Sequence, residues 1–526
     1  MSRNGGPGDN GGSQDNLELP GGNGHSGHNG HNDAVRTEIL LSHGLLPVGQ
    51  AGVFWALVTL TGIRPKAEVE AGAEGGAEAG AKEGSEVQKE RLPLNISLVL
   101  DRSGSMTGDP LEHVKEAACF VVDQLSAKDR FSLVTFDTEV DVLCPSQEVQ
   151  YKDALKARVR GIQSGSSTNL SGGLLRGYEE VRKENRAGQV NRLVLLSDGM
   201  ANVGITSPAA LRAKTRSIAE KGISVSTVGV GSQFDEDLMI NMAEGGHGNF
   251  YYVKNMDEIP RVFEQELMGL LSVVAQAITV EVNAMSGCRL VGVLGYEPQP
   301  TPDGAVLNLP DMYENDTKRL VLEIAHPPLP EGEHEVLGVT VDYTDATQAL
   351  AAVSVSVRTR LNAGYGPAEA YKPNYEVMKR VELVRTALAK DEVVERNEEG
   401  DLEEGKQVLE SRITALEELA REHGAEDPEV REEIRSLKGL VQQVEEVRTV
   451  RESHAGFVTS SSAFQTLPDS QLEQELRKQL RNQSYQTRRT MPPQPDKQAE
   501  PPQAPQQAAQ PPESSGPSQP SRPSRP

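Results

Sequence analysis

The sequence has few cysteines and no long apolar run. Its 526 residues include three cysteines, Cys119, Cys144 and Cys288, which lie far apart and form no C-x-x-C pair. This pattern argues against a disulfide scaffold and fits a reducing compartment. No apolar run approaches the roughly 18–20 residues of a membrane helix. The N-terminus also lacks the basic-then-apolar pattern of a secretory signal. We therefore expect no transmembrane segment and a cytoplasmic location, with non-standard export left open.

Basic residues are also few compared with acidic ones. Lysine and arginine number 53 against 77 aspartate and glutamate residues, which gives a net charge of −24. This balance argues against nucleic acid as a partner. Catalytic signatures are missing too, because the chain contains no Walker A motif, no H-E-x-x-H and no G-x-S-x-G. No nucleophile with an oriented base is evident. We therefore expect that the chain is not an enzyme.

One stretch, LPLNISLVLDRSGSM at residues 92–106, organises the chain. Its apolar run at 96–100 predicts a buried strand of a parallel sheet, where both faces are covered. Asp101, Ser103 and Ser105 follow at alternate positions. In an open α/β sheet, ligands bind outside the carboxyl ends of the strands. One carboxylate and two hydroxyls at that place suit a small, hard dication such as Mg²⁺.

The segment DRSGSM resembles the first part of the metal-ion-dependent adhesion site of a von Willebrand factor type A domain. Two further parts of that site occur in order, with Thr168 in GSSTNLSGG and Asp198 in LVLLSDGMANVG. The resemblance covers about residues 93–274. The D-x-S-x-S motif alone is common, but the three segments in this order are a specific combination.

The resemblance implies a role for each residue of the motif. Ser103 and Ser105 would ligate the metal directly, Asp101 and Asp198 would lie close by, often through water, and Thr168 would join when a ligand is bound. Mg²⁺ prefers six oxygens and keeps waters, and two carboxylates balance its charge. We expect Mg²⁺, with Mn²⁺ or Ca²⁺ as alternatives, and an open position for an acidic side chain of a partner.

Structural alternatives exist for these residues. Thr168 could cap the helix expected from Ser171, although Asn169 or Ser171 could also cap it. Asp198 could be a turn residue, and Asp137 at the end of another strand could support the site or only form a turn.

The function that follows is a metal-dependent protein-binding module, with a partner that presents Asp or Glu. The alternative is an accessory subunit or adaptor for a separate AAA+ ATPase, because some proteins with this kind of domain work with such motors.

Residues 92–275 alternate strand-like and helix-like segments, which predicts a doubly wound parallel α/β sheet. Asp109 and Pro110 are expected as N-cap and first residue of the first helix. The further strands are expected at 130–136, 192–198 and 222–230, and the helices at 110–125, 171–184, 208–221 and 256–271.

The flanking segments predict a β-sandwich that contains the parallel-sheet domain as an insertion. Residues 276–362 alternate apolar and polar side chains with period two, as in an antiparallel sheet with one wet face. The strand-like segments in 34–63 would be marginal alone, so we expect them to join that sheet. Trp55 is expected to anchor a core.

Residues 372–449 predict three amphipathic helices, which form a small closed bundle or present an apolar groove to a partner. Gly424 is expected to end one helix, and Asp427 with Pro428 to begin the next. The first stripe is Met378, Val381, Val384 and Leu388, and further stripes lie in 409–420 and 430–444.

Three segments predict disorder or flexibility: a Gly/Asn/His tail at 1–33, an acidic linker at 64–91, and a Pro/Gln-rich tail at 450–526. The whole layout resembles a group of bacterial von Willebrand A-domain proteins and, more loosely, the inter-α-trypsin inhibitor heavy chains.

Overall fold

The computed structural model describes residues 33–64, 91–186, 188–231, 233–348, 350–423, 427–455 and 471–489. The predicted tail at 1–33 and linker at 64–91 therefore lie almost entirely outside the described residues. In the described part of the chain, no helix is both long and apolar enough to cross a membrane.

The parallel-sheet domain contains a six-stranded sheet in the order β6-β5-β4-β7-β8-β9. Five strands are parallel and β6 pairs antiparallel with β5 at one edge. The strand order reverses between β4 and β7, which places the switch point of the sheet there. The strands are β4 (Leu94–Asp101), β5 (Arg130–Phe136), β6 (Val140–Glu148), β7 (Val190–Ser197), β8 (Ser224–Val230) and β9 (His247–Val253).

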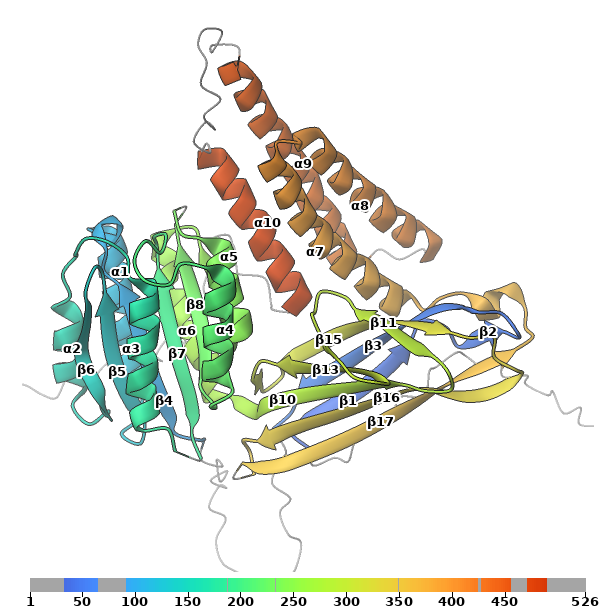
Figure 1. The fold of residues 1–526 in the computed structure, drawn as a ribbon, viewed down its shortest axis with the longest axis horizontal. Helices are drawn as coiled ribbons and strands as arrows, with labels where there is room; N and C mark the ends of the chain where they lie inside the picture. Colours follow the sequence, from blue (N-terminus) through green and yellow to red (C-terminus); the bar gives the residue numbers. More distant parts are fainter. Residues whose placement is uncertain are drawn as a thin grey trace, which may run out of the picture. The chain divides into compact units, whose positions relative to one another are not determined.

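Helices cover both faces of this sheet (Figure 1). Every residue of β4 and β7 is buried as a result, and this explains why their apolar runs do not alternate. The doubly wound fold expected from the sequence is confirmed. The helices are α1 (Asp109–Gln124), α2 (Lys152–Arg160), α3 (Leu170–Lys183), α4 (Pro208–Ala219), α5 (Glu236–Gly245) and α6 (Ile259–Leu271).

Strands β6 and β9 and helices α2 and α5 were not predicted from the sequence. The predicted N-cap of α1 is wrong. The start of α1 is not capped by Asp109, because α1 begins at Asp109 and Gly108 stands before it. Gly108 has a φ of 91°, which favours glycine. Asp109 lies instead in the first turn, where its negative charge interacts favourably with the positive end of the helix dipole.

Two mainly antiparallel sheets form a sandwich around a second core, and the one parallel pair described in them is β17 with β2. Their orders are β1-β3-β15-β11 and β12-β13-β10-β16-β17-β2, with β14 beside β10. Residues of both sheets share one buried cluster. The strands are β1 (Val35–Leu41), β2 (Leu45–Pro47), β3 (Gly52–Gly62), β10 (Val273–Ala284), β11 (Arg289–Val293), β12 (Gln299–Pro300), β13 (Gly304–Leu309), β14 (Met312–Tyr313), β15 (Thr317–His326), β16 (Gly332–Asp345) and β17 (Ala351–Gly364).

The parallel-sheet domain is an insertion in this sandwich. Strand β3 pairs with β1 on one side and with β15 on the other, from Thr317 opposite Thr61 to His326 opposite Gly52. The early strands therefore complete a sheet whose other members come more than 200 residues later, and the predicted insertion is confirmed. Strand β10 begins at Val273, so the boundary expected at residue 275 falls inside it.

A helical region follows the sandwich in the described part of the chain (Figure 1). Its helices are α7 (Tyr375–Glu399), α8 (Leu402–His423), α9 (Pro428–Ala455) and α10 (Gln471–Arg489). Helix α9 begins as expected, because Asp427 Oδ1 accepts a hydrogen bond from the backbone N–H of Glu429 at 2.9 Å. The predicted cap at Gly424 lies outside the described residues.

Helix α7 has two apolar faces, which the sequence reading treated as one. Val377, Val381 and Val384 pack against Trp55 and other residues of β3 and β15, so this stripe faces the sandwich instead of the bundle. Trp55 is therefore part of a core, as expected. The opposite face of α7 contributes its own residues to the bundle core, among them Leu383, Val393 and Val394.

The prediction of a disordered tail from residue 450 onward is wrong at 450–455, which end α9, and at 471–489, which form α10. Residues 456–470 and 490–526 lie outside the described part of the chain. Leu472, Leu476 and Leu480 lie four residues apart on α10 and pack in the core formed by α7, α8 and α9. The sequence reading missed this helix because glutamine and arginine outnumber its apolar residues. The sequence left two alternatives, a closed bundle or an apolar groove for a partner. In the structure, α10 of the same chain packs in the apolar core of α7, α8 and α9.

A buried ionic cluster joins the parallel-sheet domain to the sandwich. Arg192 on β7 is 1% exposed, and its Nη2 lies 3.0 Å from Asp311 Oδ2 while its Nε lies 3.6 Å from Glu266 Oε1. Tyr251 also donates to Glu266 at 2.7 Å. Burying charges is tolerated here because each has an opposite charge or a hydrogen bond.

We predict that Arg192→Met destabilises the protein, because Asp311 and Glu266 would remain buried without their cation. The expected loss is about 3–5 kcal/mol, measured as a lower urea midpoint of the tertiary fluorescence signal. Arg435→Met, which removes an exposed ion pair with Glu432, is the control and should change the midpoint little. Equal midpoints for both variants would contradict the role given to the cluster.

Candidate metal site

The candidate site lies where β4 ends, at the edge of the sheet formed by the carboxyl ends of the parallel strands. We call this edge the carboxyl edge. Asp101 is the last residue of β4 and has no exposed surface. Its Oδ1 accepts from the backbone N–H of Ser103 at 2.8 Å, and its Oδ2 accepts from Ser197 Oγ at 2.5 Å. Burial raises the pKa of Asp101 in spite of these donors, and Asp137 raises it further.

The second carboxylate, Asp198, directly follows β7, the neighbour of β4. Ser105 Oγ donates to Asp198 Oδ1 at 2.8 Å and lies 3.2 Å from Ser103 Oγ. Burial and the charge of Asp101 raise the pKa of Asp198 to about 6. Both carboxylates are buried and have a raised pKa, so nearby positive charge would stabilise their ionised forms.

Thr168 comes from the loop before α3, and the capping alternative for it does not hold. Asn169 is the N-cap of α3, since its Oδ1 accepts from the backbone N–H of Gly172 at 3.0 Å. Asn202 fixes Thr168 instead. Its Oδ1 accepts from the Thr168 N–H at 3.0 Å, and its own N–H donates to the Thr168 carbonyl at 3.2 Å. The Thr168 hydroxyl thus remains available at the site.

Backbone hydrogen bonds join the loop that follows β4 to the loop that precedes α3. The N–H of Gly104 donates to the carbonyl of Ser166 at 2.9 Å, and the N–H of Gly165 donates to the carbonyl of Arg102 at 2.6 Å. With the Asn202 contacts, all three loops of the candidate site are bonded to one another. The side chains therefore start from a prearranged backbone.

The three hydroxyls converge on one small region beside Gly199. A Cβ atom on Gly199 would lie 3.2 Å from Thr168 Oγ1, 3.8 Å from Ser105 Oγ and 4.0 Å from Ser103 Oγ. The absence of a side chain at Gly199 keeps this region open. Oxygen donors of this kind, two of them carboxylates and the rest hydroxyls, suit a hard divalent cation. Among the described residues, no group of three or more His, Cys, Asp or Glu side chains could hold a metal ion, so hydroxyls would have to contribute.

The structure gives Asp137 a turn role. Its Oδ1 accepts from the backbone N–H of Glu139 at 2.7 Å, and its Oδ2 lies 3.5 Å from Arg102 Nη2. Two contributors were missed from the sequence, Ser197, which holds Asp101, and Asn202, which holds Thr168. Strand β7 has no alternation of buried and exposed residues that could have marked Ser197, because the whole strand is buried.

Comparison with known proteins points to the same segment. Residues 95–265 match the family model of the von Willebrand factor type A domain. Over 199 residues the chain is 30% identical to the uncharacterized protein YfbK of Escherichia coli (strain K12), and the match covers 37% of this chain and 35% of YfbK. Over 166 residues it is 30% identical to inter-alpha-trypsin inhibitor heavy chain H3 of Rattus norvegicus, covering 30% of this chain and 19% of the heavy chain. The chain thus matches well under two thirds of the length of either relative.

The fold beyond this segment is also similar to a solved structure. A von Willebrand factor type A protein from Catenulispora acidiphila superposes with a TM-score of 0.59 and 16% sequence identity. The alignment covers 79% of this chain and 90% of that chain. At this identity the likeness shows the fold alone, but it includes more than the parallel-sheet domain.

We predict that Gly199→Ala weakens divalent-metal binding by about 10–100-fold, because the methyl group would occupy the region where the three hydroxyls converge. The measurement is a calorimetric titration of the full chain with Mn²⁺. Gly439→Ala is the control, since a Cβ there meets nothing within 4 Å, and it should bind metal as the wild type does. Unchanged affinity in Gly199→Ala would contradict this placement of the metal.

Proposed function

Because residues 95–265 are a von Willebrand factor type A domain, we propose that the chain is a metal-dependent protein-binding module. In this proposal a divalent cation at the carboxyl edge takes up an acidic side chain of a partner protein. The cation would be Mg²⁺, with Mn²⁺ or Ca²⁺ as alternatives that the same oxygen donors accept.

The observation that carries the proposal is the convergence of oxygen donors from three loops. Ser103, Ser105 and Thr168 would ligate through hydroxyls, and Asp101 and Asp198 would lie close by. The two carboxylates balance a charge of +2, while the hydroxyls add none. Because the hydroxyls add no negative charge, the cation would stay electrophilic enough to accept one more carboxylate oxygen.

The chain's own residues prepare this site. Ser197 and the Ser103 backbone hold the Asp101 carboxylate in one orientation. Ser105 does the same for Asp198. Arg102 is the cation nearest in sequence, and it is already paired with Asp141 at 2.7 Å. An acidic partner group would therefore be attracted chiefly by a bound metal and only weakly by Arg102.

A binding role fits these contacts better than hydrolysis. The Ser105 hydroxyl donates to a carboxylate, and its other described contact is Ser103. No imidazole stands among the described contacts of Ser105, in contrast to the Ser-His-Asp triad, where a histidine oriented by a third group activates the serine. The chain's lack of enzymatic activity, an adaptor role with an AAA+ ATPase and a cytoplasmic location all stay predictions.

We predict that Mg²⁺ stabilises the wild-type chain and not the variant Ser105→Ala/Thr168→Val. At a concentration of about 100 times Kd, a ligand that binds only the native state stabilises by about 2.7 kcal/mol. The measurement is the thermal midpoint with Mg²⁺ and with EDTA. Ser166→Ala is a matched control, because Ser166 lies in the Thr168 loop but its hydroxyl contacts Thr138. A similar Mg²⁺ effect in all three proteins would contradict the metal assignment.

The partner half of the proposal needs a separate measurement. Immobilised wild-type chain and Ser166→Ala should capture the same protein in Mg²⁺ and release it in EDTA. Ser105→Ala/Thr168→Val should capture little in either buffer. Substituting an acidic residue of the captured protein with its amide should then abolish binding. Capture that survives EDTA would reject the metal-dependent mechanism.

A further inference from the structure

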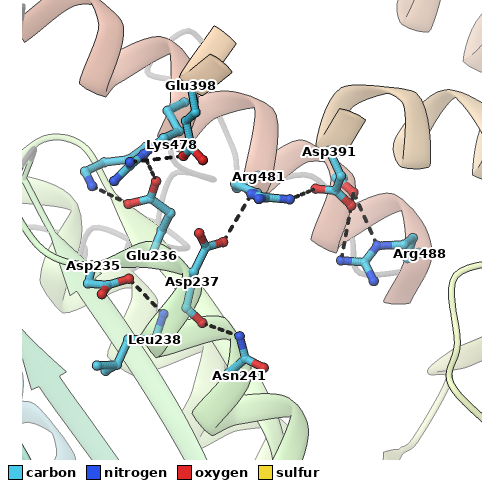
Figure 2. Close-up of polar contacts among 12 residues, drawn as sticks. Asp235, Glu236, Asp237, Leu238, Asn241, Asp391, Glu398, Lys478, Arg481 and Arg488 are labelled. Atoms are coloured by element: carbon cyan, nitrogen blue, oxygen red, sulfur yellow. Dashed lines mark hydrogen bonds and ion pairs between the residues drawn. The ribbon is translucent and has the colours of Figure 1, made fainter. Parts of the chain in front are cut away.

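Helix α10 has two faces of different chemistry. Toward α7 and α9 it presents Leu476 and Leu480, which lie in the bundle core. Toward the parallel-sheet domain it presents mainly basic side chains, which meet acidic residues of α5. Figure 2 shows the contacts with Glu236 and Asp237 of α5, together with those made with Asp391 of α7. The proposed metal-binding role uses none of them.

The most buried of these contacts is between Lys478 and Glu236, with side chains 2% and 1% exposed. Lys478 Nζ donates to Glu236 Oε2 at 2.7 Å and to the carbonyl of Phe234 at 2.6 Å. It also lies 4.2 Å from the centre of the Phe234 ring. Arg477 forms a second ion pair with Glu236. Burial alone would raise the pKa of Glu236, but Lys478 and Arg477 hold it below its ordinary value, so the carboxylate stays ionised.

Further ion pairs follow along α10 (Figure 2). Arg481 lies 3.1 Å from Asp237 on α5 and 3.1 Å from Asp391 on α7. Asp391 also accepts from Ser484 Oγ at 2.7 Å and lies 3.6 Å from Arg488. The cations of α10 thus stand between acidic residues of two helices, which would repel one another without them.

The last turns of α10 make one aromatic contact with the parallel-sheet domain. The Tyr485 ring meets the Phe250 ring edge-on at 5.6 Å between centres, and its hydroxyl accepts from the Phe250 N–H at 3.1 Å. Arg489 forms an ion pair with Glu244 at 2.8 Å. Among the described residues, the interface is therefore largely ionic, and the Phe250 and Phe234 rings add aromatic contacts.

Helix α10 also fixes a loop at the carboxyl edge. Phe234 lies between β8 and α5, and its ring covers Gly229 near the end of β8, where a Cβ would be 2.3 Å from Phe234 Cε2. Since β8 is parallel to β4 and β7, this loop leaves the sheet at the same edge as Asp101 and Asp198. Lys478 therefore holds one of the loops of the edge that carries the candidate metal site.

We infer that α10 is an electrostatic clasp: its charged side chains hold α5 and the β8–α5 loop against the helical region. When these ion pairs are weakened, α10 releases α5 and the loop while it stays packed in the helical bundle. Its leucines fasten it to α7, α8 and α9 through apolar burial, which persists when charges change. Its contacts with α5 depend on paired charges, and removing one member of a buried pair leaves the other uncompensated. The contacts of α10 with α5 should therefore break when charges are changed, while its contacts with the bundle core persist.

Hydrogen exchange of the full chain tests the clasp. Lys478→Glu should accelerate exchange of amides in 234–241 by about tenfold or more, because two buried carboxylates would face each other. Lys478→Met should do the same to a smaller degree, since Glu236 keeps Arg477. The double variant Glu236→Lys/Lys478→Glu should recover part of the protection lost in Lys478→Glu.

The controls separate release from unfolding. Amides of β4, α9 and the Leu476–Leu480 turn of α10 should keep their wild-type protection in every variant. Lys438→Glu, which breaks an exposed ion pair with Glu417, should leave 234–241 unchanged. Unchanged exchange at 234–241 in Lys478→Glu would overturn the inference. So would equal loss of protection in 234–241 and throughout α10, because the helix would then unfold instead of releasing α5.

Discussion

The architecture of the candidate site depends on keeping two carboxylates buried at the ends of adjacent parallel strands. Asp101 ends β4 and Asp198 follows β7, at the point where the strand order of the sheet reverses. Burial, together with the charge of Asp101, raises the pKa of Asp198 to about 6, so keeping both carboxylates ionised in this place costs free energy. Neutral hydroxyls around them offset this cost only in part. In the proposed function, a divalent cation supplies the positive charge that would stabilise the two ionised carboxylates.

The rest of the chain holds the parallel-sheet domain at two junctions, and only the second lies at the carboxyl edge. At the first junction, the domain is inserted in the sandwich, and the buried Arg192 cluster joins the two. At the second junction, α10 meets α5 and the β8–α5 loop through Lys478 and Glu236. Both junctions consist of buried charges in pairs. Such pairs specify one arrangement strongly, because any other arrangement leaves a charge without a partner.

How far the sequence could predict the structure depended on how local each signal was. The D-x-S-x-S motif after a strand indicated Asp101 and Ser105, because strand, turn and ligand residues are neighbours in sequence. The cap of α3 could not be assigned between Thr168 and Asn169, since both side chains can cap and only the backbone geometry decides. The two faces of α7 and the existence of α10 could not be predicted either. They depend on partners hundreds of residues away, such as Trp55 for α7 and Glu236 for α10.

The most direct test of the central claim is anomalous diffraction from crystals of the full chain grown with saturating Mn²⁺. The account predicts one anomalous peak at the carboxyl edge, within ligand distance of the Ser103 and Ser105 hydroxyls and close to Asp198. A well-ordered site without a peak, or a peak only elsewhere on the chain, would contradict it.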